Sequence, residues 1–231
     1  MKRNPHAFGR ASVIGGATLC LTLGLAAPAQ AQSAGSWLVR GGLTSVMPKV
    51  KSGELSAPSV PDTRIDVTAD TVVGGGVSYM LTDHVSVDLP LALPIRSRIQ
   101  GDGAIAGSGD IGYTKSLPAT VFLQYRFGPT DWHCRPYVGA GPTYAYFMET
   151  TGNGTLTGLT NPGGEPTTMK IQNKLGFTVQ AGVSVSLGPR VFVDLMVGKT
   201  KLKTRSTLST GQTIDVRLDP VSTGVYLGYR F

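Results

Sequence analysis

Residues 85–95 read VSVDLPLALPI, a run in which the character of the side chain changes at every step. One face is entirely aliphatic, and the other carries serine, aspartate, alanine and two prolines. The aliphatic face consists of Val85, Val87, Leu89, Leu91, Leu93 and Ile95. A period of two is the side-chain geometry of a β-strand and not of a helix. The run therefore predicts a strand with one apolar face, which must meet either a protein core or lipid.

The same alternation recurs along the chain and predicts eight strands. They are expected at residues 36–48, 71–81, 85–95, 116–127, 135–148, 174–187, 191–203 and 212–231. The connections near residues 82, 130 and 189 are short, whereas those at 49–70, 96–114, 149–173 and around 206 are longer. Outer-membrane barrels combine an even number of antiparallel strands with short periplasmic turns and longer extracellular loops. The predicted fold is therefore all-β, an eight-stranded antiparallel transmembrane β-barrel with an up-and-down meander.

The first 31 residues have the character of a secretory signal peptide. Lys2, Arg3 and Arg10 make a basic start, an apolar stretch follows at 13–27, and Ala29-Gln30-Ala31 fits a small-x-small cleavage pattern. We therefore predict a signal peptide at 1–31 and a barrel domain at 32–231, exported to a bacterial outer membrane. The barrel domain contains no run of about 18 apolar residues, the length that a transmembrane helix needs. A membrane-embedded domain must then be a closed barrel, because open sheet edges cannot face lipid.

Charge argues against one class of partner. The full chain has a formal net charge of +7, but the predicted signal carries three of its basic residues and no acid. The remaining excess is weak and scattered, so we predict no nucleic-acid partner. One local cluster comprises Lys199, Lys201, Lys203 and Arg205. Two interpretations stay open for this cluster: a solvated strand end, or a contact with the phosphates of lipopolysaccharide at the outer surface.

The chain offers little for catalysis. His84 and His133 fall in predicted periplasmic turns, and no histidine has metal-ligand spacing to a second histidine, a cysteine or a glutamate. No Gly-x-Ser-x-Gly motif marks a nucleophile, and Gly139-Ala140-Gly141 is not followed by the helical pattern of a nucleotide site. We predict that the protein is not an enzyme and has no cofactor and no metal. A membrane-embedded enzyme is a weaker alternative, because it needs catalytic side chains near the outer rim.

The second face of each predicted strand indicates what the barrel encloses. An eight-stranded barrel is only just wide enough for side chains to fill. The residues predicted to line the lumen are Arg40, Asp88, Phe122, Gln124, Arg126, Tyr137, Gln180, Asp194, Met196, Tyr226 and Arg230. The set mixes charged, amide, aromatic and apolar side chains, so it supports two interpretations of the interior.

Buried charges need partners, and the first interpretation is a salt-bridge plug in the lower barrel. Its members would be Asp88, Arg126, Asp194 and Arg230. The second interpretation places Phe122 and Met196 in an upper pocket for a hydrophobic ligand. The two are compatible, since a closed floor below an apolar vestibule would force solutes out sideways.

Residues 117–129 read LPATVFLQYRFGP and are followed by RPYVGAG at 135–141. This segment resembles a strand–turn–strand pair of the OmpW family, and the final YLGYRF at 226–231 is similar to the aromatic last strand of its members. The resemblance runs from about residue 37 to the end, and the middle segment is the more specific part. It implies an eight-stranded barrel with a narrow, largely apolar interior. It also implies passage of small hydrophobic molecules, for which a side opening into the lipid is one route.

The primary functional hypothesis is therefore a narrow outer-membrane channel or conduit for small hydrophobic molecules. The alternative is a structural or adhesive barrel whose extracellular loops bind lipopolysaccharide, phage, bacteriocin or host surfaces. Tyr229 and Phe231 resemble the signal read by the barrel-assembly machinery, although aromatic rings also favour the membrane interface. The expected partners are outer-membrane lipid and lipopolysaccharide, the assembly machinery and a small hydrophobic solute.

Overall fold

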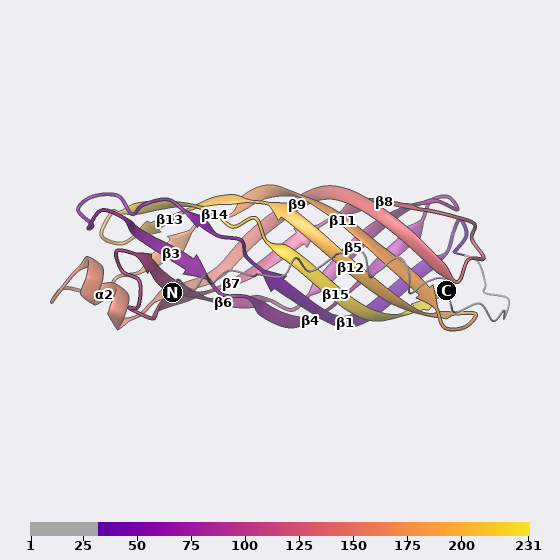
Figure 1. Ribbon diagram of the computed structural model, residues 1–231, viewed down its shortest axis with the longest axis horizontal. Helices are drawn as coiled ribbons and strands as arrows, with labels where there is room; N and C mark the ends of the chain where they lie inside the picture. The colour runs from indigo at the N-terminus through magenta and orange to yellow at the C-terminus, as the bar shows by residue number, and fades with distance from the viewer. Residues whose placement is uncertain (1–31) are drawn as a thin grey trace, which may run out of the picture.

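The computed structural model describes residues 32–231, and the predicted signal peptide at 1–31 lies outside the described residues. Within residues 32–231 the chain crosses the molecule eight times and forms an elongated antiparallel barrel (Figure 1). The eight-stranded meander predicted from the sequence is confirmed. A short helix, α2 at Gly154–Thr160, lies at one end of the barrel. In this part of the chain no helix is long and apolar enough to cross a membrane.

Most of the eight crossings are divided into two strands by a local break. In chain order they are Trp37–Met47 (β1) with Lys51–Ser52 (β2), Thr63–Val67 (β3) with Asp70–Met80 (β4), Val85–Ala92 (β5) with Ile95–Gly103 (β6), Asp110–Thr120 (β7) with Phe122–Arg126 (β8), Cys134–Gly152 (β9), Met169–Ile171 (β10) with Lys174–Ser186 (β11), Val191–Lys201 (β12) with Lys203–Leu208 (β13), and Thr213–Arg217 (β14) with Val221–Arg230 (β15). The breaks separate a lower barrel from an upper extension of the same wall.

The lower wall is a closed cylinder. Its strand order is β11-β12-β15-β1-β4-β5-β8-β9, and β9 pairs back onto β11 from Lys174↔Ala145 to Val185↔Cys134. Closure satisfies the backbone groups that a free edge would expose to lipid. A second sheet of order β10-β13-β14-β2, together with β3, β6 and β7, continues the wall toward α2.

The two ends of the barrel differ in their connections. One end carries the short links at 81–84, 127–133 and 187–190, and Phe231 also lies there (Figure 1). The opposite end carries α2 and the second sheet. Short links mark the periplasmic end of an outer-membrane barrel, so the end with α2 is extracellular.

Several boundaries differ from the sequence prediction, mostly in the extracellular extension, where β10 at Met169–Ile171 and β13 at Lys203–Leu208 also occupy predicted connections. β3 lies inside the connection predicted at 49–70, β6 occupies much of the one predicted at 96–114, and β7 begins at Asp110 instead of residue 116. β6 pairs with β7, and β7 continues along β9 through a register shift between Lys115 and Ser116. These strands were missed because their alternation is the reverse of that in the lower barrel: in β6, Ile95, Ser97 and Ile99 are buried whereas Arg96 and Arg98 are exposed, so no apolar face points outward.

The facing of Ile95 is also corrected. It was predicted on the outer face with Val85, but only 5% of Ile95 is exposed, and its side chain lies inside the barrel. β5 ends at Ala92 and β6 begins at Ile95, while Leu93 and Pro94 between them are both exposed. An irregular step of this kind changes the phase of a strand, so every residue beyond it points to the opposite face.

The outer face of the lower barrel is apolar around its whole circumference. Exposed aliphatic residues on successive strands include Leu43, Val73, Leu89, Leu123, Val179, Val197 and Val225. Aromatic pairs lie at the periplasmic end, with ring centroids 4.8 Å apart for Trp37–Tyr79 and 4.8 Å apart for Tyr229–Phe231. An apolar band with an aromatic girdle is the surface that a barrel presents to lipid.

Replacing Val179 by arginine tests this assignment. Val179 is 50% exposed and lies near the middle of the apolar face of β11. Val179→Arg should lower the free energy of unfolding in lipid vesicles by about 2–4 kcal/mol, because a cation is then held near the bilayer centre. Urea titration followed by tryptophan fluorescence measures the change. Ala106→Arg, in an exposed extracellular turn, is the matched control and should have little effect; equal stability of both variants would contradict a lipid-facing Val179.

Candidate functional site

A buried ion pair lies inside the lower barrel. Arg40 on β1 donates from both terminal nitrogens to the two oxygens of Asp88 on β5, at 2.7 and 2.9 Å. The Ser78 hydroxyl on β4 donates to Asp88 at 2.5 Å, and Arg40 also donates to Ser78 at 3.1 Å. All three residues are buried. A bidentate pair with a third partner is the arrangement that a buried charge requires.

A second polar cluster lies across the lumen. The Tyr137 hydroxyl and the Ser184 hydroxyl donate to the two oxygens of Asp194, at 2.8 and 2.7 Å. Arg126 donates to Ser184 at 3.1 Å and to Gln124 at 3.0 Å, and its guanidinium lies 4.9 Å from the ring centre of Tyr137. Arg126 and Asp194 are thus connected through Ser184. Among the described residues they make no direct ion pair.

These contacts revise the predicted plug. The partner of Asp88 is Arg40, which the plug prediction left out, while Arg126 is held by hydroxyl and amide groups. Arg230 lies lower, where it donates to the Pro189 carbonyl and the Ser186 hydroxyl at 3.4 Å each. Charge alone suggested which residues could form ion pairs. The stagger of the strands decides which of them lie at the same height in the barrel.

The other predicted lumen residues also point inward. Phe122, Gln124, Gln180 and Tyr226 are buried, and Met196 is partly buried. The Tyr226 hydroxyl lies 2.8 Å from the Thr44 hydroxyl, and the guanidinium of Arg40 lies 5.4 Å from its ring centre. The polar section therefore reaches from the periplasmic turns up to the level of Thr44.

A belt of threonine hydroxyls caps this polar section. Thr120, Thr143, Thr178 and Thr200 come from four successive crossings, and their hydroxyls are joined in a chain at 2.8, 2.5 and 2.8 Å. All four are buried. Sequence reasoning missed this belt. The available signal was that each threonine occupies an inward position of its strand.

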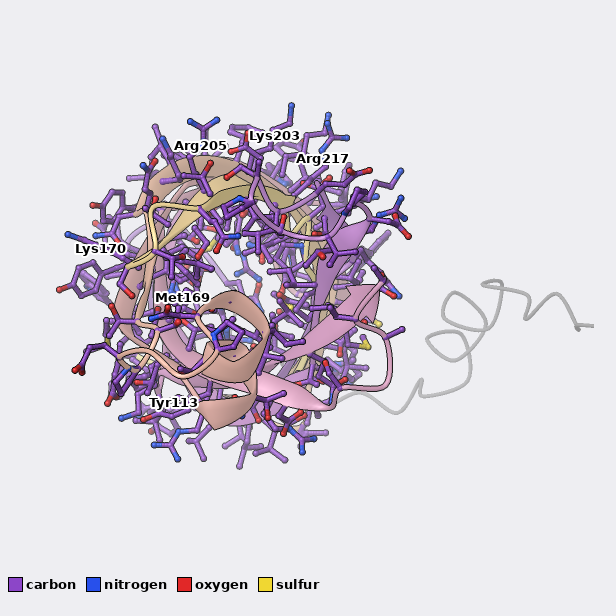
Figure 2. The ribbon with its side chains drawn as sticks, turned by 90° about the vertical axis from the view of Figure 1, so that its left-hand side faces the viewer. Tyr113, Met169, Lys170, Lys203, Arg205 and Arg217 are labelled. Carbon is purple, nitrogen blue, oxygen red and sulfur yellow. The ribbon has the colours of Figure 1, made fainter. Side chains whose placement is uncertain are left out.

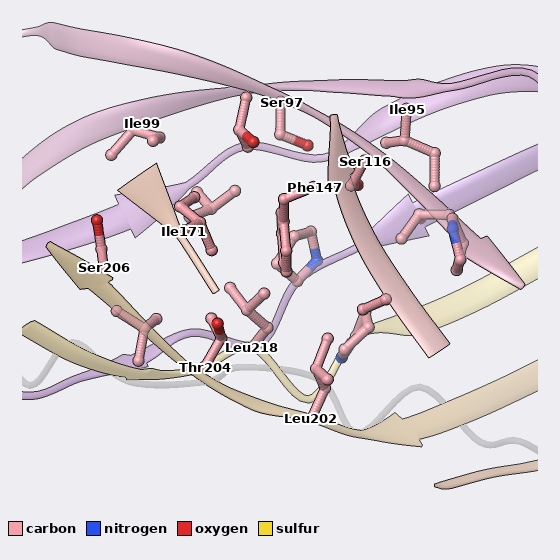
Figure 3. A pocket seen from close by; sticks show the side chains of 18 of the residues that line it. Ile95, Ser97, Ile99, Ser116, Phe147, Ile171, Leu202, Thr204, Ser206 and Leu218 are labelled. Carbon is pink, nitrogen blue, oxygen red and sulfur yellow. The ribbon is translucent and has the colours of Figure 1, made fainter. Parts of the chain in front are cut away.

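Above the belt the interior becomes apolar. A cavity of about 90 Å³ lies there, with walls from every crossing (Figure 3). Its apolar lining includes Val46, Ile65, Ile95, Ile99, Ala145, Phe147, Leu202 and Leu218. Phe122 and Met196, predicted to shape an upper pocket, are absent from its lining and lie among the polar residues below. The phase of a strand sets the side on which a residue lies, but its height depends on the register.

A second apolar space lies toward the extracellular end. It measures about 70 Å³ and shares Ile65 and Met169 with the cavity below. Leu156 of α2 packs there against Ile99, Ile111 and the neighbouring apolar side chains. We call these two adjoining spaces, which share part of their lining, the apolar column.

One seam of the wall lacks strand pairing at the level of this column. β5 pairs with β8 up to Asp88↔Phe122, and the next pair across the seam is Ile95↔Ser116 between β6 and β7. Residues 89–94 and 117–121 have no register partner across it. The segments contain Pro90, Pro94 and Pro118, and proline has no N–H to donate. Ile95, Ser116 and Pro118 line the cavity as well, so the seam and the cavity adjoin.

Comparison with known proteins agrees with this architecture. The sequence profile of the OmpW family matches residues 33–231. This chain belongs to the OmpW family. Outer membrane protein W of Vibrio cholerae is 32% identical to it over 211 residues, which cover 89% of this chain and 93% of that protein. Outer membrane protein AlkL of Ectopseudomonas oleovorans is 23% identical over 224 residues, covering 95% and 92%.

Solved structures of outer-membrane proteins share the fold of this OmpW-family chain. The crystal structure of OprG from Pseudomonas aeruginosa superposes with a TM-score of 0.79 at 26% identity, covering 88% of this chain and 99% of OprG. The solution structure of outer membrane protein W from Escherichia coli gives a TM-score of 0.57 at 28% identity, covering 87% and 100%. This OmpW-family protein is therefore an outer-membrane β-barrel.

The ion pair in the floor of this OmpW-family barrel can be tested by a double-mutant cycle. Arg40→Ala or Asp88→Ala alone should lower the free energy of unfolding by about 3–5 kcal/mol, because each leaves a buried charge without its partner. The double variant should cost less than the sum of the two. Urea unfolding in lipid vesicles measures all four proteins.

The exposed pair Lys115–Glu149 provides the control cycle, and its removal should change stability little. Additive losses at Arg40 and Asp88 would contradict their coupling.

Proposed function

We propose that this barrel is a conduit for small hydrophobic molecules, which enter at the extracellular end and leave sideways into the lipid. One observation carries the proposal. An apolar column lies above a lower lumen occupied by buried polar side chains, and it adjoins a seam of the wall that has no strand pairing. A solute in the column therefore meets a closed path below it and a weak wall beside it.

The floor opposes axial passage of an apolar solute. Below the threonine belt the lumen is filled by buried groups such as Arg40, Asp88, Arg126 and Asp194, which are bound to one another or to neighbouring polar groups. An apolar molecule passing there would break hydrogen bonds and leave buried charges without partners, at several kcal/mol for each group. In the apolar column above, the same molecule would not have to break these hydrogen bonds or separate these charges.

The seam favours lateral exit. Leu89, Leu91, Leu93 and Val121 on its two sides are exposed on the lipid-facing surface. Each side keeps pairing with its outer neighbour, since β5 pairs with β4 and β7 pairs with β9. The two sides can therefore separate without breaking a hydrogen-bonded ladder between them. This supports an exit that opens directly from an apolar cavity onto acyl chains.

We also propose that the barrel has no catalytic role. Among residues 32–231 no three His, Cys, Asp or Glu side chains are grouped to hold a metal ion. The His84 ring lies at the periplasmic end, where its Nδ1 is 3.0 Å from the Arg126 carbonyl and the ring stacks on Tyr125. The relatives are named as outer membrane proteins.

Locking the seam tests the conduit. Leu91 and Ala119 both point outward from opposite sides of it, and cysteines at these positions can be joined by a reducible bis-maleimide in a Cys134→Ser background. Uptake is followed with a naphthylamine dye that fluoresces in the membrane, in cells lacking the native gene. Cross-linking should lower uptake to the rate of cells without the protein, and reduction of the linker should restore it.

Tyr125→Cys with Val138→Cys is the matched control, because these outward positions are already register partners between β8 and β9. Its cross-link should leave uptake unchanged. Full uptake through the locked seam would reject lateral exit. Equal uptake with and without the protein would instead favour the alternative of a structural or adhesive barrel.

A further inference from the structure

A strongly basic surface covers one side of the extracellular extension. It lies on the outer face of the sheet β10-β13-β14-β2, together with the start of β11. Its cations are Lys51, Lys174, Lys203, Arg205 and Arg217, and we call it the basic face. Lys203, Arg205 and Arg217 project outward from the same arc of the wall, away from Tyr113 (Figure 2).

Three of these cations form one row across the sheet. Lys203 on β13 is the register partner of Arg217 on β14, and Arg217 is the partner of Lys51 on β2. Directly opposed residues on one face have side chains about 4.5–5.5 Å apart at Cβ, and like charges in this position destabilise a sheet. A row of three cations is therefore a cost to the fold that a bound anion would remove.

Acidic side chains neutralise only part of the basic face. Asp215 accepts from Arg205 at 2.6 and 2.8 Å, and the Arg205 guanidinium holds the pKa of the Asp215 carboxyl below its usual value. Asp219 lies 3.9 Å from Arg217. Among the described residues no carboxylate lies within 4 Å of the amines of Lys51, Lys174 or Lys203. The groove among these residues thus keeps an excess of positive charge.

The remaining wall of the extension, formed by β3, β6, β7 and β9, is arranged differently. Arg64 pairs with Asp62 at 2.6 Å, Arg98 with Asp110 at 3.6 Å, and Lys115 with Glu149 at 2.5 Å. These three cations have acidic partners built into the chain, and the guanidinium of Arg96 lies 5.5 Å from the ring centre of Tyr113. The contrast shows that the excess charge on the basic face is a property of that face and not of the whole extension.

The basic face begins where the lipid-facing surface ends. On β11, Lys174 is adjacent to Leu175, which is 71% exposed at the top of the apolar face. On β12 and β13 the outward row continues from the aliphatic Val197 into Lys199, Lys201 and Lys203. The groove is shallow and open to solvent, and Gln172, Thr204, Asp215 and Val216 line it together with the five cations.

We propose that the basic face binds the phosphate groups of lipopolysaccharide packed against the barrel in the outer leaflet. The charge of the basic face and its height above the membrane identify the partner. Phosphorylated sugars lie directly above acyl chains, and the row Lys51–Arg217–Lys203 lies directly above the apolar band. The contact holds the barrel in the leaflet, and it does not depend on transport through the lumen.

The test uses the mature chain in detergent micelles and measures binding of deep-rough lipopolysaccharide by native mass spectrometry. The triple variant Lys51→Gln, Lys203→Gln, Arg217→Gln removes the row. Binding should weaken about a hundredfold, given about fivefold for each of the three cations removed near an anionic lipid surface. Dephosphorylated lipopolysaccharide should bind the wild-type chain about as weakly as the intact lipid binds the triple variant.

The matched control is Arg64→Gln, Arg98→Gln, Lys115→Gln, which removes the same charge from β3, β6 and β7, outside the basic face. It should bind lipopolysaccharide as the wild type does, and gel mobility with and without heating shows that both variants are folded. Equal loss of lipopolysaccharide binding in both variants would overturn the proposal, because binding would then depend on the net charge alone and not on the basic face. Displacement of the lipid by millimolar inorganic phosphate would also overturn it, since the site would then be one for the free ion.

Retention of binding in EDTA would support direct contact between phosphates and side chains. Binding that EDTA abolishes in the wild type would overturn it, because divalent cations would then bridge the lipid to acidic residues. These outcomes are independent of the dye-uptake assay. The conduit and the lipid contact can therefore fail separately.

Discussion

The structure depends on one constraint: a backbone in lipid must satisfy its N–H and C=O groups within the protein. Eight antiparallel crossings meet it by closing β9 onto β11, which leaves the lower wall without a free edge except at the seam between 89–94 and 117–121. Closure also fixes the two surfaces, because successive side chains along each strand point alternately to lipid and to the lumen. The apolar band and the filled interior are thus two results of the same geometry.

The unpaired seam is informative because it departs from that constraint. Residues 89–94 and 117–121, which contain three prolines, are not paired with each other across the seam. On their other sides pairing continues, between β5 and β4 and between β7 and β9. Lipid cannot satisfy free backbone groups, so an interruption at membrane depth has a cost. The unpaired backbone groups lie beside the apolar cavity, and this position is the reason for proposing the seam as an exit.

Polarity divides the interior by height. Among the described residues, the buried ion pair Arg40–Asp88 and buried hydroxyl and amide groups occupy the periplasmic half, and aliphatic side chains line the extracellular half. A buried ion pair adds little net stability compared with apolar packing, but it holds its partners in one arrangement. Arg40 and Asp88 therefore hold β1 and β5 in one arrangement across the lower lumen. The outer surface is divided as well, with an excess of cations on one side of the extension and paired charges on the other.

The sequence by itself determined the number of strands, the meander and the inward or outward side of most residues, because a period of two is visible without a partner strand. It could not determine which inward residues meet. Asp88 pairs with Arg40, and four threonines join in a belt, only because register and stagger bring distant strands to the same height. The predicted side of Ile95 was also wrong, because an irregular step at Leu93–Pro94 turns its side chain inward. The tertiary structure alone decided these features, since heights within a barrel follow from closure of the whole wall and not from any single strand.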